Sequence, residues 1–163
     1  MLTIPVRKGE PPKTTTSNPH EQLTQNPDAD MYQLFKTKLF TFNGVSRRPS
    51  IISVPGSEAL WLNEGQACNC ADGFMIGREF AHIHPAYDGS LHVALSADDF
   101  QQVIESRWGE RHPLAGLHGI PETIAMVYAP RTEEEMEVVL MVVAASLDNA
   151  KNKKEDAVWV TQR

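Results

Sequence analysis

The chain has 163 residues, of which 41% are hydrophobic, and its 21 acidic and 15 basic side chains give a formal net charge of −6. This size and composition predict one globular domain with a hydrophobic core. The negative charge, without any long Lys/Arg run, argues against nucleic acid and anionic membranes as partners. Neither a run of 18 apolar residues nor a signal-peptide pattern occurs, so we expect a soluble, cytoplasmic protein.

The first 28 residues are rich in Pro, Thr, Asn and Gln and contain few apolar side chains. Such a composition predicts a disordered arm with no core of its own, so His20 is assigned no role. The folded domain is expected over residues 29–150, and a tail over 151–163. Cys68 and Cys70, one residue apart, are expected to form a reduced pair in a loop, because so tight a spacing rarely closes as a disulfide.

The apolar spacing predicts three helices. The first begins near Asp30, the second begins at Ser96 and stops at Gly109, and the third follows a capping box of Thr132 and Glu135. Strands are predicted at residues 51–54, 59–62, 74–84, 91–95 and 123–130, with a loop at 64–72. The predicted fold is a single α+β domain: a mostly antiparallel β-sheet backed by helices, with a central β-hairpin that carries histidines.

That hairpin lies in "REFAHIHPAYDGSLHVAL", residues 78–95. A three-residue loop, Tyr87 to Gly89, would pair His84 with His92. Side chains alternate along strands, so His82, His84 and His92 would share one face. The opposite, apolar face would carry Ala81, Ile83, Leu91, Val93 and Leu95. A two-residue loop would shift the register by one residue and move His92 to the apolar face.

Three interpretations of this histidine trio remain open. His82, His84 and His92 could hold a metal ion, although no carboxylate ligand is obvious: Asp88 lies in the turn, and Glu79 belongs to the other face. They could instead line a metal-free pocket that binds and deprotonates an acidic organic substrate, since histidine titrates near neutral pH. They could also be hydrogen-bonded side chains on a half-exposed sheet face, without chemistry.

Other candidate groups lie outside the hairpin. Arg111 and His112 follow the second helix, in a loop that Pro113 makes rigid. Tyr128 and Arg131 end the last strand, where the arginine could bind an enolate or carboxylate with a forked pair of hydrogen bonds. Arg131 could equally form a salt bridge with the acidic residues at 133–135.

Three segments, "REFAHIHPAYDGSLHVALSADD", "WGERHPLAG" and "VYAPRTEEEMEVVLMVVAAS", occur in this order between residues 78 and 146. Together they strongly resemble the fungal luciferase family, over about residues 77–148. Those enzymes oxidise a hydroxylated styrylpyrone, 3-hydroxyhispidin. The resemblance implies that O₂ adds to the pyrone enolate and that the resulting peroxide loses CO₂. It also implies a small-molecule substrate, O₂ as cosubstrate and no organic cofactor.

The resemblance carries seven positions onto this chain as expected site residues, and Tyr87, where this chain departs from the luminous members, is added as an eighth candidate. The catalytic candidates are His82, His84, His92 and His112, with His84 or His92 as the base for the enolic hydroxyl. The substrate-binding candidates are Arg111, Tyr128, Arg131 and Tyr87, with either arginine stabilising the enolate. A metal, if one is bound, would be held by His82, His84 and His92.

Two departures separate this chain from the luminous members. It has Pro85 and Tyr87 where they carry an acidic residue and a histidine, and a polar arm where they carry an apolar membrane segment. We therefore expect a soluble relative, with or without light emission. Two alternatives stay open: a non-catalytic binding protein for an aromatic or phenolic metabolite, and a metal-dependent enzyme with histidine ligands. The sequence leaves the oligomeric state open.

Overall fold

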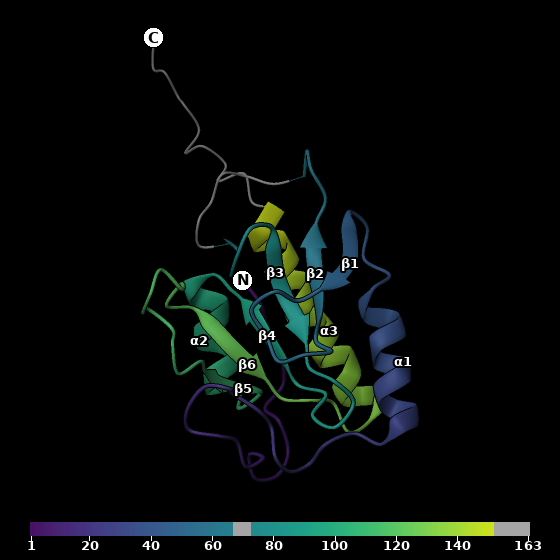
Figure 1. The fold of residues 1–163 in the computed structure, drawn as a ribbon. Helices are drawn as coiled ribbons and strands as arrows, with labels where there is room; N and C mark the ends of the chain where they lie inside the picture. The colour runs from purple at the N-terminus through teal and green to yellow at the C-terminus, as the bar shows by residue number, and fades with distance from the viewer. Residues whose placement is uncertain (67–72, 152–163) are drawn as a thin grey trace.

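Six antiparallel strands form one sheet in the computed structural model, which describes residues 1–66 and 73–151 (Figure 1). The strand order is β1-β2-β3-β4-β6-β5. The strands are β1 (Val45–Pro49), β2 (Glu58–Leu62), β3 (Glu79–Ile83), β4 (Leu91–Ala94), β5 (Gly109–Arg111) and β6 (Ile124–Val127). With three helices packed around this sheet, the predicted single α+β domain is confirmed. The Cys68–Cys70 prediction and nearly all of the 151–163 tail lie outside the described residues.

The helices are α1 (Ala29–Leu39), α2 (Ala97–Glu105) and α3 (Glu133–Lys151). Asp28, rather than Asp30, caps α1 by accepting a hydrogen bond from the Met31 N–H. Helix α2 ends four residues before Gly109, which instead begins β5. A Cβ on Gly109 would lie 2.2 Å from the Met126 carbonyl oxygen, so the strand pairing requires glycine there. Among the described helices, none is both long and apolar enough to span a bilayer.

The predicted strand at residues 51–54 is wrong, because the first strand is β1, Val45–Pro49. A hydrogen bond of 3.0 Å from the Ser50 N–H to the Ser57 carbonyl closes residues 51–56 into a loop. Ile51 and Ile52 are 68% and 46% exposed, so their apolar, β-branched side chains mimicked a strand without forming one. The predicted strand 74–84 is likewise shorter, since only Glu79–Ile83 is paired as β3.

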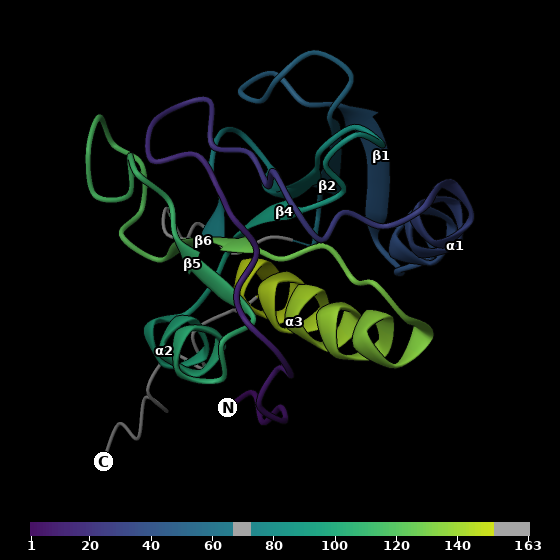
Figure 2. The ribbon, with the colours of Figure 1, turned by 90° about the horizontal axis from the view of Figure 1, so that it is seen from below.

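Helix α3 covers one face of the sheet, whereas loops and the N-terminal segment lie on the other (Figure 2). The covered face carries the five apolar residues predicted from the hairpin: Ala81, Ile83, Leu91, Val93 and Leu95. All five are buried and belong to the same core cluster as Met136, Val139 and Val143 of α3. The predicted core face of the hairpin is therefore confirmed.

Residues 1–28 do not form the expected free arm. Leu2 and Ile4 are buried in the core cluster, and the Trp108 indole N–H donates to the Pro5 carbonyl at 2.6 Å. The segment then passes the ends of β5 and β6 and reaches the opposite face of the sheet, as the purple trace in Figure 2 shows. Its polar composition misled the prediction because its contacts on that face are hydrogen bonds rather than apolar packing. His20, which was assigned no role, is 3% exposed.

The hairpin register differs by two residues from the predicted one. His82, rather than His84, pairs with His92, and the His84 N–H donates to the Ser90 carbonyl at 2.9 Å. The loop is therefore longer than three residues, because Asp88 turns inward and its carboxylate accepts from the Ser90 N–H at 2.8 Å. A shift of two residues leaves every side chain on its predicted face, since strand side chains alternate with a period of two.

Candidate functional site

A pocket of about 480 Å³ opens on the sheet face that α3 does not cover. All six histidines of the chain line it, although they come from four separate segments: the N-terminal segment, β3 with the residue after it, β4, and the connection between β5 and β6. They are His20, His82, His84, His92, His112 and His118. The remaining wall is largely apolar and includes Ile52, Val54, Met75, Ile76, Leu114, Ile120 and Ile124. The pocket thus combines an apolar wall with a concentration of imidazoles.

The three hairpin histidines lie together, as predicted. Nε2 of His82 and Nδ1 of His92 are 3.0 Å apart, and the ring centroids of His84 and His92 are 4.7 Å apart. The exposed fractions of His82, His84 and His92 are 3%, 1% and 4%, so the half-exposed sheet face considered from the sequence is excluded. Both faces of this hairpin are buried, one in the apolar core and one behind the pocket.

Glu79 lies on the histidine side of β3, contrary to the prediction. The pairing of β2 with β3 shifts between Leu60 and Trp61, so that Phe80 is an extra residue on β3. Such a bulge reverses the alternation for the residues beyond it. Oε1 of Glu79 consequently accepts a hydrogen bond of 2.9 Å from Nδ1 of His82 and one of 2.7 Å from the Ser50 hydroxyl.

Asp88 is also part of the site rather than a plain turn residue. Its carboxylate is fully buried and accepts from His84 Nδ1 at 2.9 Å, from the Ser90 hydroxyl at 2.5 Å and from the Gln22 N–H at 3.0 Å. Burial alone would raise the pKa of Asp88, but the hydrogen bonds from His84 and Ser90 outweigh it and lower the pKa. Asp88 is therefore ionised and holds the His84 ring with the Nδ1 proton toward it.

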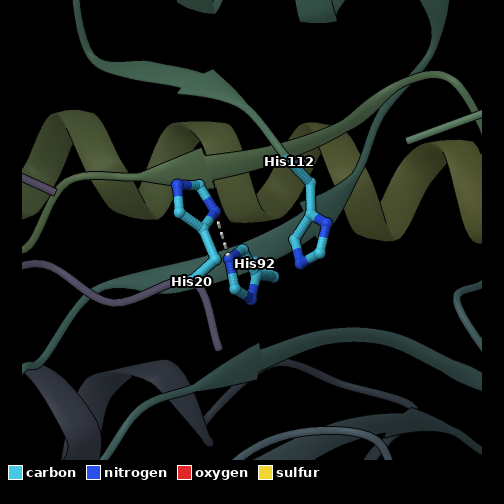
Figure 3. Close-up of side chains that lie close together, drawn as sticks. All are labelled: His20, His92 and His112. Atoms are coloured by element: carbon cyan, nitrogen blue, oxygen red, sulfur yellow. Dashed lines mark hydrogen bonds between the residues drawn. The ribbon is translucent and has the colours of Figure 1, made fainter. Parts of the chain in front are cut away.

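The N-terminal segment adds a further imidazole and β5 adds a further carboxylate. Nδ1 of His20 lies 3.0 Å from Nε2 of His92 (Figure 3), whereas His82 contacts the other ring nitrogen of His92. Nε2 of His20 lies 2.7 Å from Oε1 of Glu110, whose other oxygen accepts from the Tyr128 hydroxyl at 3.0 Å. Glu79, His82, His92, His20 and Glu110 thus form one continuous series of side chains, each at hydrogen-bond distance from the next.

Burial keeps several of these imidazoles neutral at neutral pH. Desolvation, followed by the nearby rings of His82, His84, His112 and His20, lowers the pKa of His92 well below its ordinary value. The pKa of His82 is lowered by burial, despite the opposing hydrogen bond to Glu79. For His112, burial and the neighbouring His20 lower the pKa to about 4. These rings are therefore uncharged at neutral pH.

We expect the domain to lose stability as the pH falls from about 6.5 to about 4. The His112 pKa is lower in the folded than in the unfolded chain, so unfolding takes up a proton in this window and becomes more favourable as pH falls. Urea unfolding followed by circular dichroism at pH 7, 5.5 and 4.5 measures this effect. His112→Ala should show a shallower decline. Equal stability at pH 7 and 4.5 would contradict the expectation.

His112, predicted as catalytic, does reach the pocket. Its ring meets that of His92 with centroids 4.5 Å apart and an interplanar angle of 71°, and Figure 3 shows it beside His92 without a hydrogen bond to it. Nδ1 of His112 accepts from the Leu114 N–H at 3.0 Å. A neutral imidazole carries one proton, so the proton of His112 resides on Nε2.

The four predicted substrate-binding residues are not among the residues that line the pocket. Arg131 instead forms an ion pair of 2.7 Å with Glu135, the alternative that the sequence had left open. Tyr128 binds Glu110, and Arg111 donates to the Ala115 carbonyl at 3.3 Å. Tyr87 is 60% exposed, and its hydroxyl donates to Glu21. None of the four therefore lines the pocket, and their role in binding substrate stays a prediction.

Five further residues of the site were missed from the sequence: His20, Glu79, Asp88, Glu110 and His118. A shared signal was available for His20 and His118, because each is a histidine followed or preceded by Pro or Gly within two residues. Such rigid turns can fix a side chain in a loop. No local signal identifies Glu110, since its partner His20 lies 90 positions away in the chain.

Comparison with known proteins confirms the family resemblance over the central part of the chain. Residues 77–146 match the family model described as "Luciferase domain". The chain is similar to a luciferase of Armillaria ostoyae, with 45% identity over 85 residues, and to one of Neonothopanus nambi, with 50% identity over 72 residues. A luciferase of Armillaria gallica is 49% identical over 72 residues.

These matches cover 51%, 43% and 43% of this chain, but only 32%, 27% and 27% of the three luciferases, in the order Armillaria ostoyae, Neonothopanus nambi and Armillaria gallica. The matched part of the chain thus spans about a third or less of the length of these relatives. No solved structure matches the chain. The matched segment contains His82, His84, His92 and His112, whereas His20 lies outside it.

Proposed function

We propose that this chain, with its luciferase domain at residues 77–146, is a luciferase-like enzyme that oxidises an enolic pyrone such as 3-hydroxyhispidin in the histidine-lined pocket. O₂ adds to the enolate to give a peroxide, whose outer oxygen bonds to the lactone carbonyl carbon. Loss of that carbon as CO₂ breaks the O–O bond and leaves one oxygen atom of O₂ in the CO₂ and the other in a new carbonyl group of the product, so neither an external reductant nor an organic cofactor is needed. Light emission is not required by this chemistry. The observation that carries the proposal is the set of imidazoles converging on one pocket within the luciferase domain.

The size and lining of the pocket support a small aromatic substrate. Its volume of about 480 Å³ lies within the range typical of small-molecule sites, about 300–1,000 Å³. Ile52, Val54, Leu114 and Ile120 offer apolar surface for flat rings. The hydroxyl groups of a phenolic pyrone would face the imidazoles, which both donate and accept hydrogen bonds.

The histidines supply the base that the reaction needs. Burial lowers the pKa of His92, so its ring is a neutral proton acceptor at neutral pH. His92 also contacts His82 and His20 through its two nitrogens, so a proton taken from the enolic hydroxyl can pass toward Glu79 or Glu110. We assign His92 as the base on this ground, with His84 as the second candidate.

Stabilisation of the enolate must come from a group other than the arginines predicted from the sequence. Arg131 is paired with Glu135, and Arg111 points to the Ala115 carbonyl. In the described part of the chain, the pocket lining contains neither Arg nor Lys. The imidazole N–H groups are the donors that remain for the developing negative charge.

The test is to mix purified protein with 3-hydroxyhispidin in air and to follow pyrone absorbance, O₂ uptake, CO₂ release and photon counts. We expect pyrone loss and O₂ uptake in a 1:1 ratio, with or without photons. Heat-denatured protein serves as the control for spontaneous oxidation. Saturable binding of a pyrone that stays unchanged would instead identify a binding protein. If the protein neither binds nor converts the pyrone, pyrones are excluded as its ligands.

A further inference from the structure

We infer that His82, His84 and His92 form a binding site for a divalent first-row transition-metal ion at the floor of the pocket. The ligand nitrogens of these three buried residues lie within 4.8 Å of one another. Imidazoles bind Zn²⁺ at about 2.0–2.1 Å, which places neighbouring ligand atoms on one ion about 3.0–3.4 Å apart. The 3.0 Å between Nε2 of His82 and Nδ1 of His92 is already within that spacing.

The carboxylates around the trio orient its lone pairs. Glu79 accepts from Nδ1 of His82, and Asp88 accepts from Nδ1 of His84, so each ring carries its proton on Nδ1. Nε2 of both residues then carries no proton and has a lone pair available for a metal ion. This carboxylate–histidine arrangement is the one that positions histidine ligands in metal sites and makes them more basic.

The third lone pair belongs to Nδ1 of His92. Glu110 accepts from Nε2 of His20, which leaves Nδ1 of His20 as an acceptor. His92 therefore donates from Nε2 to His20 and keeps its lone pair on Nδ1, which faces Nε2 of His82. Two lone pairs 3.0 Å apart repel unless a cation lies between them. Every imidazole proton of this network has an acceptor, and the three lone pairs that remain belong to the trio.

Charge points to the same conclusion. The side chains of Glu79 and Asp88 are 1% and 0% exposed, and in the described part of the chain their ion pairs are with histidines alone. Buried carboxylates are expensive unless they face a positive charge or support a bound metal. A divalent cation on the three imidazoles would balance the two carboxylates behind them.

A second group of histidines, His20, His92 and His112, also lies within 4.8 Å, but its protons are wrongly placed. Nδ1 of His112 uses its lone pair to accept from the Leu114 N–H, so Nε2 is protonated and does not bind a metal. The inference therefore commits to the trio on the hairpin. Three neutral imidazoles without a thiolate suit Zn²⁺, Fe²⁺, Co²⁺, Ni²⁺ or Cu²⁺, with an open coordination position toward the pocket.

This site shares the pocket of the proposed function. An ion bound at Nδ1 of His92 takes the lone pair with which the metal-free ring would act as base, so in the loaded protein the ion, as a Lewis acid, would activate the enolic hydroxyl instead. The test of the site uses neither pyrone nor O₂. Protein stripped with a chelator is titrated with Co²⁺, and its visible absorption bands report coordination by nitrogen ligands. Elemental analysis of protein from metal-supplemented cells measures the content directly. We expect about one equivalent of ion per chain.

Matched variants locate the ion. His84→Ala should weaken Co²⁺ binding by at least about 100-fold, and Glu79→Gln by about 10-fold, because it alters the partner of a ligand rather than the ligand. His118→Ala and His112→Ala, which remove pocket histidines outside the trio, should leave the affinity within about threefold. Thermal unfolding tests whether each variant is folded. If His84→Ala does not fold, the Co²⁺ affinities of wild type, His112→Ala and Glu79→Gln still test the inference, because only Glu79→Gln should weaken binding.

Two results would overturn the inference: less than about 0.1 equivalent of any transition metal with no cobalt band, or a loss in His112→Ala as large as that in Glu79→Gln. A protein that binds the ion but leaves pyrones unchanged would refute only the proposed function. Pyrone oxidation by a protein that binds no metal would refute only the metal site.

Discussion

Replacement of His92 by alanine is expected to slow pyrone oxidation by about 100-fold or more, the usual contribution of a general base. His92 is the central member of the series from Glu79 to Glu110, and it lies at hydrogen-bond distance from both His82 and His20. Its removal interrupts the path from the pocket to both carboxylates and removes one ligand of the inferred metal site. Initial rates of O₂ uptake at saturating and at low pyrone concentration measure the loss in kcat and in kcat/KM.

The control for His92→Ala must be a polar residue far from the pocket, because all six histidines line it. Gln101→Ala on the exposed side of α2 meets this need, and we expect wild-type rates from it. His92→Ala leaves Nδ1 of His20 without its donor, at a cost of about 1–3 kcal/mol, so its fold is verified by circular dichroism. A folded His92→Ala with a rate within threefold of wild type would remove His92 as the base.

Replacement of Val93 by aspartate is expected to abolish folding. Val93 is fully buried on the core face of β4, in the same cluster as Val139 and Val143 of α3. A carboxylate there has no partner, and its burial should cost about 5 kcal/mol or more, comparable with the whole stability of a typical domain. Urea unfolding at pH 7, followed by circular dichroism, should show no cooperative transition.

Met141→Asp is the matched control for Val93→Asp. Met141 is 46% exposed on α3, so the same charge there should change the free energy of unfolding by less than about 1 kcal/mol. A cooperatively folded Val93→Asp, together with an unfolded His84→Ala, would mean that the two faces of the hairpin are exchanged.

The division of the hairpin into a histidine face and an apolar face was predictable from the sequence because it depends only on the alternation of side chains along a strand. The predicted register was two residues off, yet His82, His84 and His92 still share a face. An error of one residue would have separated them. The start of α2 was predictable for a similar reason. The Ser96 hydroxyl oxygen caps the helix by accepting a hydrogen bond from the Asp99 N–H, only three residues away.

The carboxylates of the site were not predictable from the same alternation. Glu79 reaches His82 only because Phe80 is an extra residue in the pairing of β2 with β3, and bulges are set by the partner strand. Asp88 looked like an ordinary turn residue in "YDG", but its carboxylate is turned inward by hydrogen bonds from His84, Ser90 and Gln22. Arg131 shows the reverse case, because its nearby partner Glu135 was foreseen and is the one it binds.

The sequence by itself determined the α+β class, the apolar core face of the hairpin and the grouping of three imidazoles, because each follows from the covalent geometry of neighbouring residues. Only the tertiary structure decided that the N-terminal segment lines the pocket and that its polar residues form hydrogen bonds there. His20 meets His92 across 72 positions and Glu110 across 90. Contacts at such separations depend on how the whole chain packs, which no local pattern of polarity records.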